Sequence, residues 1–214
     1  MSKKIVLAYS GGLDTSVAVR WLTDKGFAVI CFLAGVGQGK AFSEAKKRAH
    51  AAGAKKVVIQ NLEDEFVEDF IWPSLKANAV YESKYLLATA LSRPLIAKAL
   101  VEIAHREKAD FVGHGCTGKG NDQVRFEVSV ALLDPGIKVI APVREWDLPT
   151  RESEIRYAKL HKIPIDVTKK KVYSIDSNLW GVSIEGGKLE DPWFEPGEDV
   201  YQVTKEPSKS PDKP

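Results

Sequence analysis

The chain has few cysteines, no long apolar run and almost no net charge. Cys31 and Cys116 are its only cysteines in 214 residues, too few for a disulfide framework or a cysteine-rich metal cluster. No apolar run approaches the roughly 20 residues that a membrane-spanning helix needs. With 31 basic and 29 acidic residues, the net charge of +2 gives no electrostatic case for nucleic acid or an anionic membrane as a partner.

Targeting signals are also missing from the sequence as given. Residues 1–4, MSKK, lead directly into an apolar strand, without the apolar segment of a signal peptide. Together with the two isolated cysteines, this favours a reducing cytoplasm. The composition, 44% hydrophobic and 28% charged, is that of an ordinary globular protein with a real core.

The most informative segment is residues 9–16, YSGGLDTS, between an apolar run at 5–8 and an amphipathic stretch at 17–25. This order predicts a strand, a tight turn and a helix. Adjacent glycines let the backbone turn sharply with no Cβ in the way of a ligand. Free N–H groups at the helix start, with three hydroxyls around them, favour a polyphosphate. The plainer alternative is a simple turn with Asp14 or Ser10 as the helix cap.

Strand-length apolar runs alternate with helical periodicity along the first three quarters of the chain. The pattern predicts an α/β fold: a doubly wound, mainly parallel five-stranded sheet with helices on both faces. Right-handed crossovers would then place the loops after the strands on one edge, where ligands bind. Strands are expected at 5–9, 28–33, 56–59, 111–112 and 138–141. Helices are expected at 15–25, 42–52, 63–75 with a break or restart at Pro73, from Pro94 onward, 124–133 and 151–161.

The pattern changes after the last predicted helix. Residues 172–196 contain three glycines and two prolines, which predicts irregular structure or short hairpins. Residues 205–214 have the composition of a linker. We therefore expect a nucleotide-binding domain at 1–165, an irregular substrate-contacting extension at 166–204 and a linker-like tail.

A second glycine-rich loop, residues 113–122, follows the fourth predicted strand. Gly113, Gly118 and Lys119 have the spacing of a Walker A loop, but Gly120 stands where a serine or threonine should hold Mg²⁺. The Walker A interpretation is therefore rejected. A flexible surface loop is one alternative. We favour a second ligand-binding turn, because two such turns after two parallel strands would open on the same edge.

Three polar residues, Asn121, Asp122 and Arg125, follow at the start of a helix. Their structural alternatives are a helix cap for Asp122 and a surface ion pair of Arg125 with Asp122 or Glu127. Taken alone, these alternatives are about as good as a functional role. The neighbouring glycines favour function.

These segments resemble known proteins. Residues 10–16 resemble the pyrophosphate loop of the N-type ATP pyrophosphatases, the PP-loop superfamily, with its adenine nucleotide alpha hydrolase-like fold. Residues 115–127, GCTGKGNDQVRFE, resemble one family within it, argininosuccinate synthase. Further resemblance to that family lies, in order, in FIWP at 70–73, ALSRPLI at 90–96, VIAPVREW at 139–146 and YSIDSNLWG at 173–181.

The resemblance implies a carbon–nitrogen ligase of arginine biosynthesis that uses ATP and Mg²⁺. The ureido oxygen of citrulline would attack the α-phosphorus of ATP, and the amine of aspartate would then displace AMP from the citrullyl adenylate. Such chemistry needs the phosphates held as a leaving group and the substrates positioned, without a protein nucleophile.

The resemblance also implies roles for individual residues. The catalytic residues would be Asp14 and Lys119. ATP would be bound by Ala8, Tyr9, Ser10, Gly11, Gly12, Leu13, Asp14, Thr15, Ser16, Ala34 and Gly115. Aspartate would be bound by Thr117, Asn121 and Asp122. Citrulline would be bound by Tyr85, Thr89, Asn121, Arg125, Ser174 and Ser183. No metal ligands are assigned.

Two departures qualify the resemblance. Some members carry a serine where this chain has Ala90, and Thr89 is the expected substitute. The family continues into a second domain of comparable length, with further citrulline contacts and a helix for a homotetramer; the chain is expected to be monomeric or to pair with a separate C-terminal half. Two other functions stay open: an ATP-binding domain without independent turnover, and another PP-loop adenylating enzyme such as a tRNA thiolase.

Overall fold

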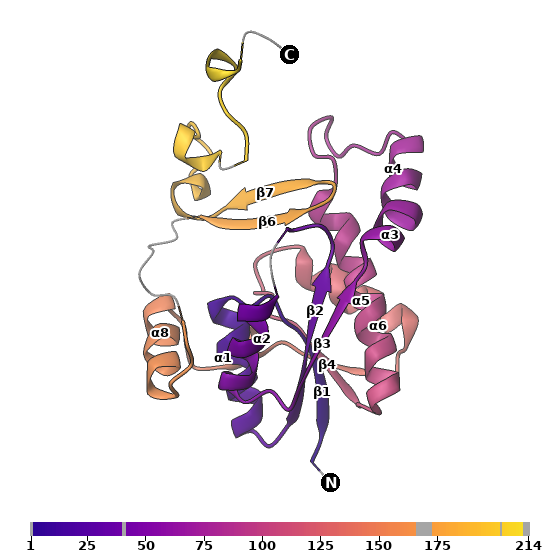
Figure 1. The fold of residues 1–214 in the computed structure, drawn as a ribbon, viewed down its shortest axis with the longest axis vertical. Coiled ribbons are helices and arrows are strands. Elements are labelled where there is room, and N and C mark those ends of the chain that lie inside the picture. Colours follow the sequence, from indigo (N-terminus) through magenta and orange to yellow (C-terminus); the bar gives the residue numbers. More distant parts are fainter. Residues whose placement is uncertain (1, 40–41, 166–172, 202, 212–214) are drawn as a thin grey trace.

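A computed structural model describes residues 2–39, 42–165, 173–201 and 203–211. Its centre is a five-stranded sheet in which every neighbouring pair is parallel, in the order β3-β2-β1-β4-β5 (Figure 1). The strands are β1 (Lys4–Ala8), β2 (Ala28–Gly35), β3 (Lys56–Asn61), β4 (Phe111–Gly113) and β5 (Lys138–Ile140). The predicted doubly wound parallel sheet is confirmed. The order reverses between β1 and β4, so the loops after these two strands are the expected ligand-binding loops.

Helices cover both faces of the sheet, because alternate strand residues point to opposite sides. Ile5 and Leu7 of β1 pack in a core with α1 (Leu13–Asp24), α2 (Ser43–Ala52) and α8 (Arg151–Leu160). Val6, between them, packs in a second core on the other face with α5 (Ala88–Glu107) and α6 (Asp122–Leu133). Figure 1 shows α1, α2 and α8 on one side of the strands and α5 and α6 on the other.

The helical segment predicted at residues 63–75 changes from α-helix to π-helix and back to α-helix before the proline. It consists of α3 (Glu63–Glu65), a π-helical stretch (Phe66–Ile71) and α4 (Trp72–Lys76). Pro73 lies in the first turn of α4, where a missing N–H costs no intrahelical bond. The predicted restart at Pro73 is therefore what the structure shows.

The prediction that Pro94 opens the long helix is wrong. Helix α5 begins at Ala88, and Pro94 lies inside it. Its start is capped by the hydroxyl of Tyr85, which accepts hydrogen bonds from the N–H groups of Thr89 at 3.0 Å and Ala90 at 3.1 Å. A proline in the helix interior loses one backbone hydrogen bond, but the buried apolar face of α5 keeps the helix on the sheet.

After the sheet, the chain forms an antiparallel hairpin of β6 (Ser174–Asn178) and β7 (Gly181–Glu185). The hairpin lies above the carboxyl ends of the strands in Figure 1. It docks on the start of α5, where the Asn178 side chain donates to the Ala88 carbonyl at 2.9 Å. It also docks on the loop after β2, because the Leu179 N–H donates to the Val36 carbonyl at 2.8 Å. The predicted short hairpin is thus confirmed.

The remaining elements are short: α7 (Pro142–Glu145) and 3₁₀ turns at Gly187–Glu190, Glu198–Val200 and Pro207–Lys209. Within the described ranges, no helix combines the length and the apolar character needed to cross a bilayer.

Candidate functional site

The first glycine turn is shaped by close backbone packing. Gly11 has φ +78°, and a Cβ at this position would lie 2.8 Å from the Cβ of Ala45 in α2. Arg48, also in α2, donates a hydrogen bond to the Gly11 carbonyl. Its Nε is buried and has no hydrogen-bond partner among the described residues. The turn therefore requires glycine and has a guanidinium beside it, which favours an anionic ligand.

The start of α1 has no side-chain cap. Gly12 is the N-cap residue, so neither Ser10 nor Asp14 caps the helix. The first intrahelical bond runs from the Ser16 N–H to the Gly12 carbonyl at 3.2 Å. The N–H groups of residues 13–15 precede that bond and need partners from outside the helix. They form the kind of anion site that the sequence predicts after the first strand.

Of the hydroxyl residues around this turn, Tyr9, Thr15 and Ser16 are buried and Ser10 is exposed. Tyr9 and Ser16 are buried and lie 2.9 Å apart through their oxygens, and Ser16 donates to the Gly12 carbonyl at 2.6 Å. Burial raises the pKa of Tyr9 to about 12, so its phenol stays protonated. Ser10 is exposed, and its Oγ lies 3.1 Å from Oγ1 of Thr15. Tyr9 and Ser16 shape the turn from inside, while Ser10, held by the buried Thr15, is the exposed hydroxyl at this turn.

The second glycine-rich loop meets the first turn. A Cβ on Gly115 would lie 2.7 Å from Cγ2 of Thr15, so the two loops are in close contact. The loop is anchored by the buried His114, whose Nδ1 accepts from the Cys116 N–H at 3.2 Å and whose Nε2 lies 3.3 Å from Glu127. Burial lowers the pKa of His114, which favours a neutral ring with its proton on Nε2. The predicted convergence of the two loops on one edge is confirmed.

Ala34, one of the predicted ATP-binding residues, lies near the end of β2. Its carbonyl accepts a hydrogen bond from the Gln38 side-chain amide at 2.7 Å, and the Val36 N–H donates to the Gln38 oxygen at 2.7 Å. The Gln38 side-chain amide is thus hydrogen-bonded to both the Val36 N–H and the Ala34 carbonyl. An adenine that used the Ala34 carbonyl would have to share it with Gln38.

Charged side chains form a cluster at the start of α6. Asp122 does not cap the helix; its Oδ1 accepts from Arg125 at 2.7 Å and its Oδ2 from Arg93 of α5 at 2.8 Å. Arg93 also donates to Asp176 of β6. Of the alternatives left open by the sequence, the pairing of Arg125 with Asp122 is present, together with two partners that sequence reasoning missed.

Four predicted citrulline residues are distributed over α5, the loop before it and the hairpin. Thr89 Oγ1 lies 3.0 Å from Ser183 Oγ, which brings α5 and β7 together. Tyr85 accepts two backbone N–H groups, so its own O–H proton is the group left for a ligand. Ser174 is exposed at the far end of β6, on the same face as Asp176.

The side chains of three predicted site residues, Thr117, Lys119 and Asn121, lie outside the hydrogen-bonded groups of α5, α6 and the hairpin. The side chains of Thr117 and Lys119 are exposed, and the Lys119 N–H donates a hydrogen bond to Thr117 Oγ1 at 3.4 Å. Asn121 is exposed and is the N-cap residue of α6 without a side-chain cap bond. These three residues therefore line the open side of the second loop.

Sequence reasoning missed a carboxyl pair beside the first turn. Glu154 of α8 is hydrogen-bonded to Asp14, and burial together with this neighbour raises its pKa to about 8. Sequence reasoning also missed Arg93, although it lies in the quoted segment 90–96. No local signal points to either partner, because the contacts join residues 29 to 140 positions apart. Only a predicted topology of helices around the sheet could have found them.

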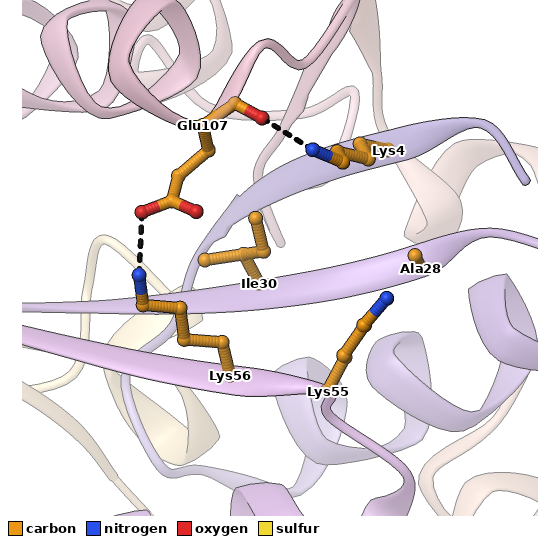
Figure 2. A pocket seen from close by; sticks show the side chains of 6 residues that line it. All are labelled: Lys4, Ala28, Ile30, Lys55, Lys56 and Glu107. Atoms are coloured by element: carbon orange, nitrogen blue, oxygen red, sulfur yellow. Dashed lines mark hydrogen bonds and ion pairs between the residues drawn. The ribbon is translucent and has the colours of Figure 1, made fainter.

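Two cavities among the described residues lie away from these groups. One, of about 220 Å³, lies beside the amino ends of β1 and β3, as Figure 2 shows. There Glu107 accepts from Lys56 at 2.6 Å through its carboxylate and from Lys4 at 2.7 Å through its backbone. A second cavity, of about 280 Å³, is lined by residues of α8 and the loop before it. Neither of these two cavities is lined by residues of the glycine loops.

The fold and these loops define a class. A parallel sheet with the order β3-β2-β1-β4-β5, an uncapped glycine turn after β1 and a second glycine loop after β4 are the features of a doubly wound nucleotide-binding protein of the PP-loop type.

Comparison with known proteins gives the family. The family model described as the arginosuccinate synthase N-terminal HUP domain matches residues 4–164, and the model of the arginosuccinate synthase C-terminal domain matches residues 173–214. The chain belongs to the argininosuccinate synthase family. The domain boundaries expected after residues 165 and 204 stay predictions.

Curated relatives named argininosuccinate synthase match nearly the whole chain. The protein from Thermoanaerobacter sp. (strain X514) is 60% identical over 99% of this chain and 52% of its own length. The Aquifex aeolicus (strain VF5) protein is 56% identical over 99% of this chain and 53% of its length. The chloroplastic Arabidopsis thaliana protein is 55% identical over 99% of this chain and 43% of its length. The chain thus spans about half the length of the curated relatives it matches.

Proposed function

We propose that the chain carries out the ATP-dependent ligation of citrulline and aspartate to argininosuccinate, with AMP and pyrophosphate as the other products. One observation carries the proposal. Gly115 lies against Thr15, so the free N–H groups of α1 and the charged cluster of α6 open on the same edge of the sheet. The name shared by the relatives, argininosuccinate synthase, agrees with this assignment.

In this proposal the first turn binds the ATP phosphates. The N–H groups of residues 13–15, with Ser10 and Thr15 beside them, would hold the β- and γ-phosphates as the leaving group. Mg²⁺ is usually held by one or two carboxylates and the phosphates themselves, and Asp14 in the first turn of α1 offers such a carboxylate. The ion would neutralise charge on the phosphate oxygens. Lys119, exposed in the second loop, is the further cation assigned to them.

The charged cluster and the hairpin would bind the two amino acids. Arg125 presents a planar fork that suits the citrulline carboxylate, with Tyr85, Thr89, Asn121, Ser174 and Ser183 as the further citrulline residues. Asp122 would accept the ammonium of aspartate, beside Thr117 and Asn121. The ureido oxygen would then attack the α-phosphorus with loss of pyrophosphate, and the aspartate amine would displace AMP, so the protein contributes mainly positioning and electrostatics.

The test is citrulline-dependent exchange of labelled pyrophosphate into ATP by the 214-residue chain, followed by argininosuccinate formation on addition of aspartate. Exchange requires adenylation but no aspartate. Asp122→Asn should therefore keep most of the exchange and lose product formation by about tenfold or more, because a charged hydrogen bond to the ammonium is weakened. Asp69→Asn, which changes an exposed carboxylate on the π-helical stretch, is the matched control and should behave as wild type. Equal loss of exchange and product in Asp122→Asn would contradict its assigned role.

A second candidate function is an ATP-binding domain without independent turnover. The observation that favours it is the uncapped glycine turn before α1, which offers an anion site whether or not the amino acids are joined. ATP binding in calorimetry without any citrulline-dependent exchange would support it. The oligomeric state, and pairing with a separate C-terminal half, belong to the same question and are measured by light scattering during the assay.

The third alternative, a tRNA thiolase, needs a reactive thiolate. Burial raises the pKa of Cys116 to about 12 and raises that of the buried Cys31 as well. Both thiols therefore stay protonated at neutral pH, which is the inert state of cysteine. This argues against thiol chemistry, and we propose a cytoplasmic enzyme of amino-acid substrates instead.

A further inference from the structure

Arg93 joins three elements of the site through one guanidinium group. We propose that Arg93 is a positioning residue: it fixes the orientation of Asp122 and holds the β6–β7 hairpin, with Ser174 and Ser183, over the substrate residues. The inference rests on the proposed function, because it assigns a role within the same site. Arg93 itself is not assigned a contact with a substrate.

The guanidinium group of Arg93 contacts one carboxylate on each of two neighbouring elements, Asp122 of α6 and Asp176 of β6. Its Nε donates to Asp122 Oδ2 at 2.8 Å, and its Nη2 lies 2.8 Å from the same oxygen. Nη2 also donates to Asp176, and Nη1 lies 3.4 Å from Ser92 Oγ. The side chain is 16% exposed. The three elements α5, α6 and β6 thus meet at one buried cation, and lysine, with a single ammonium, could not reproduce this geometry.

The charge balance explains why the cation must be there. Burial opposes the charged form of Arg93, but Asp176 and Asp122 outweigh it, and the net effect raises its pKa. Without the guanidinium, two carboxylates on different elements would face each other at partly buried positions. Removal of one partner from such a group is costly, because the remaining charges are left uncompensated. The hairpin would then be repelled from α6 rather than held against it.

Arg93 also influences how Asp122 and Arg125 face the substrates. Arg93 occupies Oδ2 of Asp122 while Arg125 occupies Oδ1 at 2.7 Å, so the carboxylate is fixed by a cation on each oxygen. Loss of Arg93 would leave Arg125 as the main counter-charge of Asp122. Arg125 would then be less available to a citrulline carboxylate, and Asp122 less precisely oriented toward an ammonium. Arg93 therefore affects both amino-acid substrates without touching either.

Hydrogen exchange of the chain without substrates tests the positioning directly. In Arg93→Met, amide exchange should be faster by about tenfold in both residues 174–185 and residues 121–127, because contacts on both sides are lost. Asp176→Asn should accelerate exchange in the hairpin alone. Arg106→Met, a change of an exposed arginine on the same helix, is the matched control and should leave both segments unchanged. Unchanged hairpin exchange in Arg93→Met would overturn the inference, whatever the enzymatic activity.

Steady-state kinetics test the consequence for substrates. Arg93→Met should raise the KM for aspartate and for citrulline by about tenfold each, with the KM for ATP within about twofold of wild type. Arg93→Lys should recover hairpin protection but not the aspartate KM, because it restores charge without the fork. Full recovery by lysine, or an equal rise in all three KM values, would contradict the orienting role. Wild-type protein without any citrulline-dependent exchange would count against the proposed function alone, since hydrogen exchange still decides the positioning.

Discussion

Replacement of Glu154 by glutamine should change how the stability of the protein depends on pH. Glu154 lies on α8, hydrogen-bonded to Asp14 at the start of α1, and its burial, together with the nearby Asp14 carboxyl, favours its protonated form. Glutamine can donate the same hydrogen bond through its amide but does not ionise. The variant therefore keeps the contact and removes the titration.

The sign follows from the raised pKa. The Glu154 pKa is about 8 in the folded protein, against 4.5 as its ordinary value. The stabilisation from the protonated carboxyl is fully present below pH 4.5 and is lost as the pH rises through about 8. For a fully buried group this interval would correspond to about 5 kcal/mol. Glu154 is only half-buried, so solvent screening reduces the expected effect to about 1–2 kcal/mol.

Urea unfolding at pH 5.5, 7.0 and 8.5 measures this effect. The range from pH 5.5 to 8.5 covers about two thirds of the expected loss, so the free energy of unfolding of wild type should fall by about 1 kcal/mol more than that of Glu154→Gln. Glu152→Gln, an exposed neighbour on the same helix, should follow wild type. Wild type and Glu154→Gln with parallel pH dependence would refute the raised pKa of Glu154.

Four further predictions concern the turn, the cluster and the core. Gly12→Ala should lower ATP affinity by about tenfold in calorimetry, because its new Cβ would intrude on phosphates. Among the described residues, that Cβ would meet only Ser10 Oγ, at 3.3 Å, so the fold should tolerate it; unchanged affinity would refute the phosphate turn. Gly11→Ala should instead destabilise the fold by about 1–2 kcal/mol in urea, since φ is +78° there. Arg125→Lys should weaken citrulline binding by about tenfold in titrations, and wild-type affinity would show that Arg125 is purely structural. Leu95→Ala, in the fully buried face of α5, should cost about 3 kcal/mol of stability without a change in substrate specificity.

The sheet could be predicted from the sequence because its signal is local. Val6 and its neighbours in β1 are a continuous apolar run, which is typical of a strand buried on both faces. The glycines after β1 and β4 are equally visible, and the rule for parallel sheets places both loops on one edge. Their contact, Gly115 against Thr15, follows from this topology.

The start of α5 could not be predicted in the same way. Pro94 is a typical first-turn residue, so the sequence indicated a helix start there. The actual start depends on the Tyr85 hydroxyl, which caps the helix from a loop whose residues Glu82, Ser83 and Leu87 have positive φ values. Such conformations are costly for non-glycine residues and persist only where surrounding contacts impose them. The three residues with positive φ lie within three positions of Tyr85, which is a predicted citrulline-binding residue.

The pairing of the charged groups in the site could be predicted only where the partners are close in sequence. Asp122 and Arg125 are three positions apart on a helix, a spacing at which side chains meet, so their pairing was among the alternatives. The link from Arg93 to Asp176 spans 83 residues and depends on where the hairpin lands on α5. That position is set by tertiary contacts that no local pattern encodes.

The docking of the hairpin also has a consequence for synthesis on the ribosome. Every strand of the sheet is complete by residue 140, and domains fold as units as the chain emerges from its N-terminus. Leu179, which packs against Gly37, is translated later. While the ribosome pauses between these two points, the nascent chain would hold a finished sheet, but the edge that carries the glycine loops would not yet be covered by the hairpin. Pausing in this interval would therefore favour binding of chaperones to that edge.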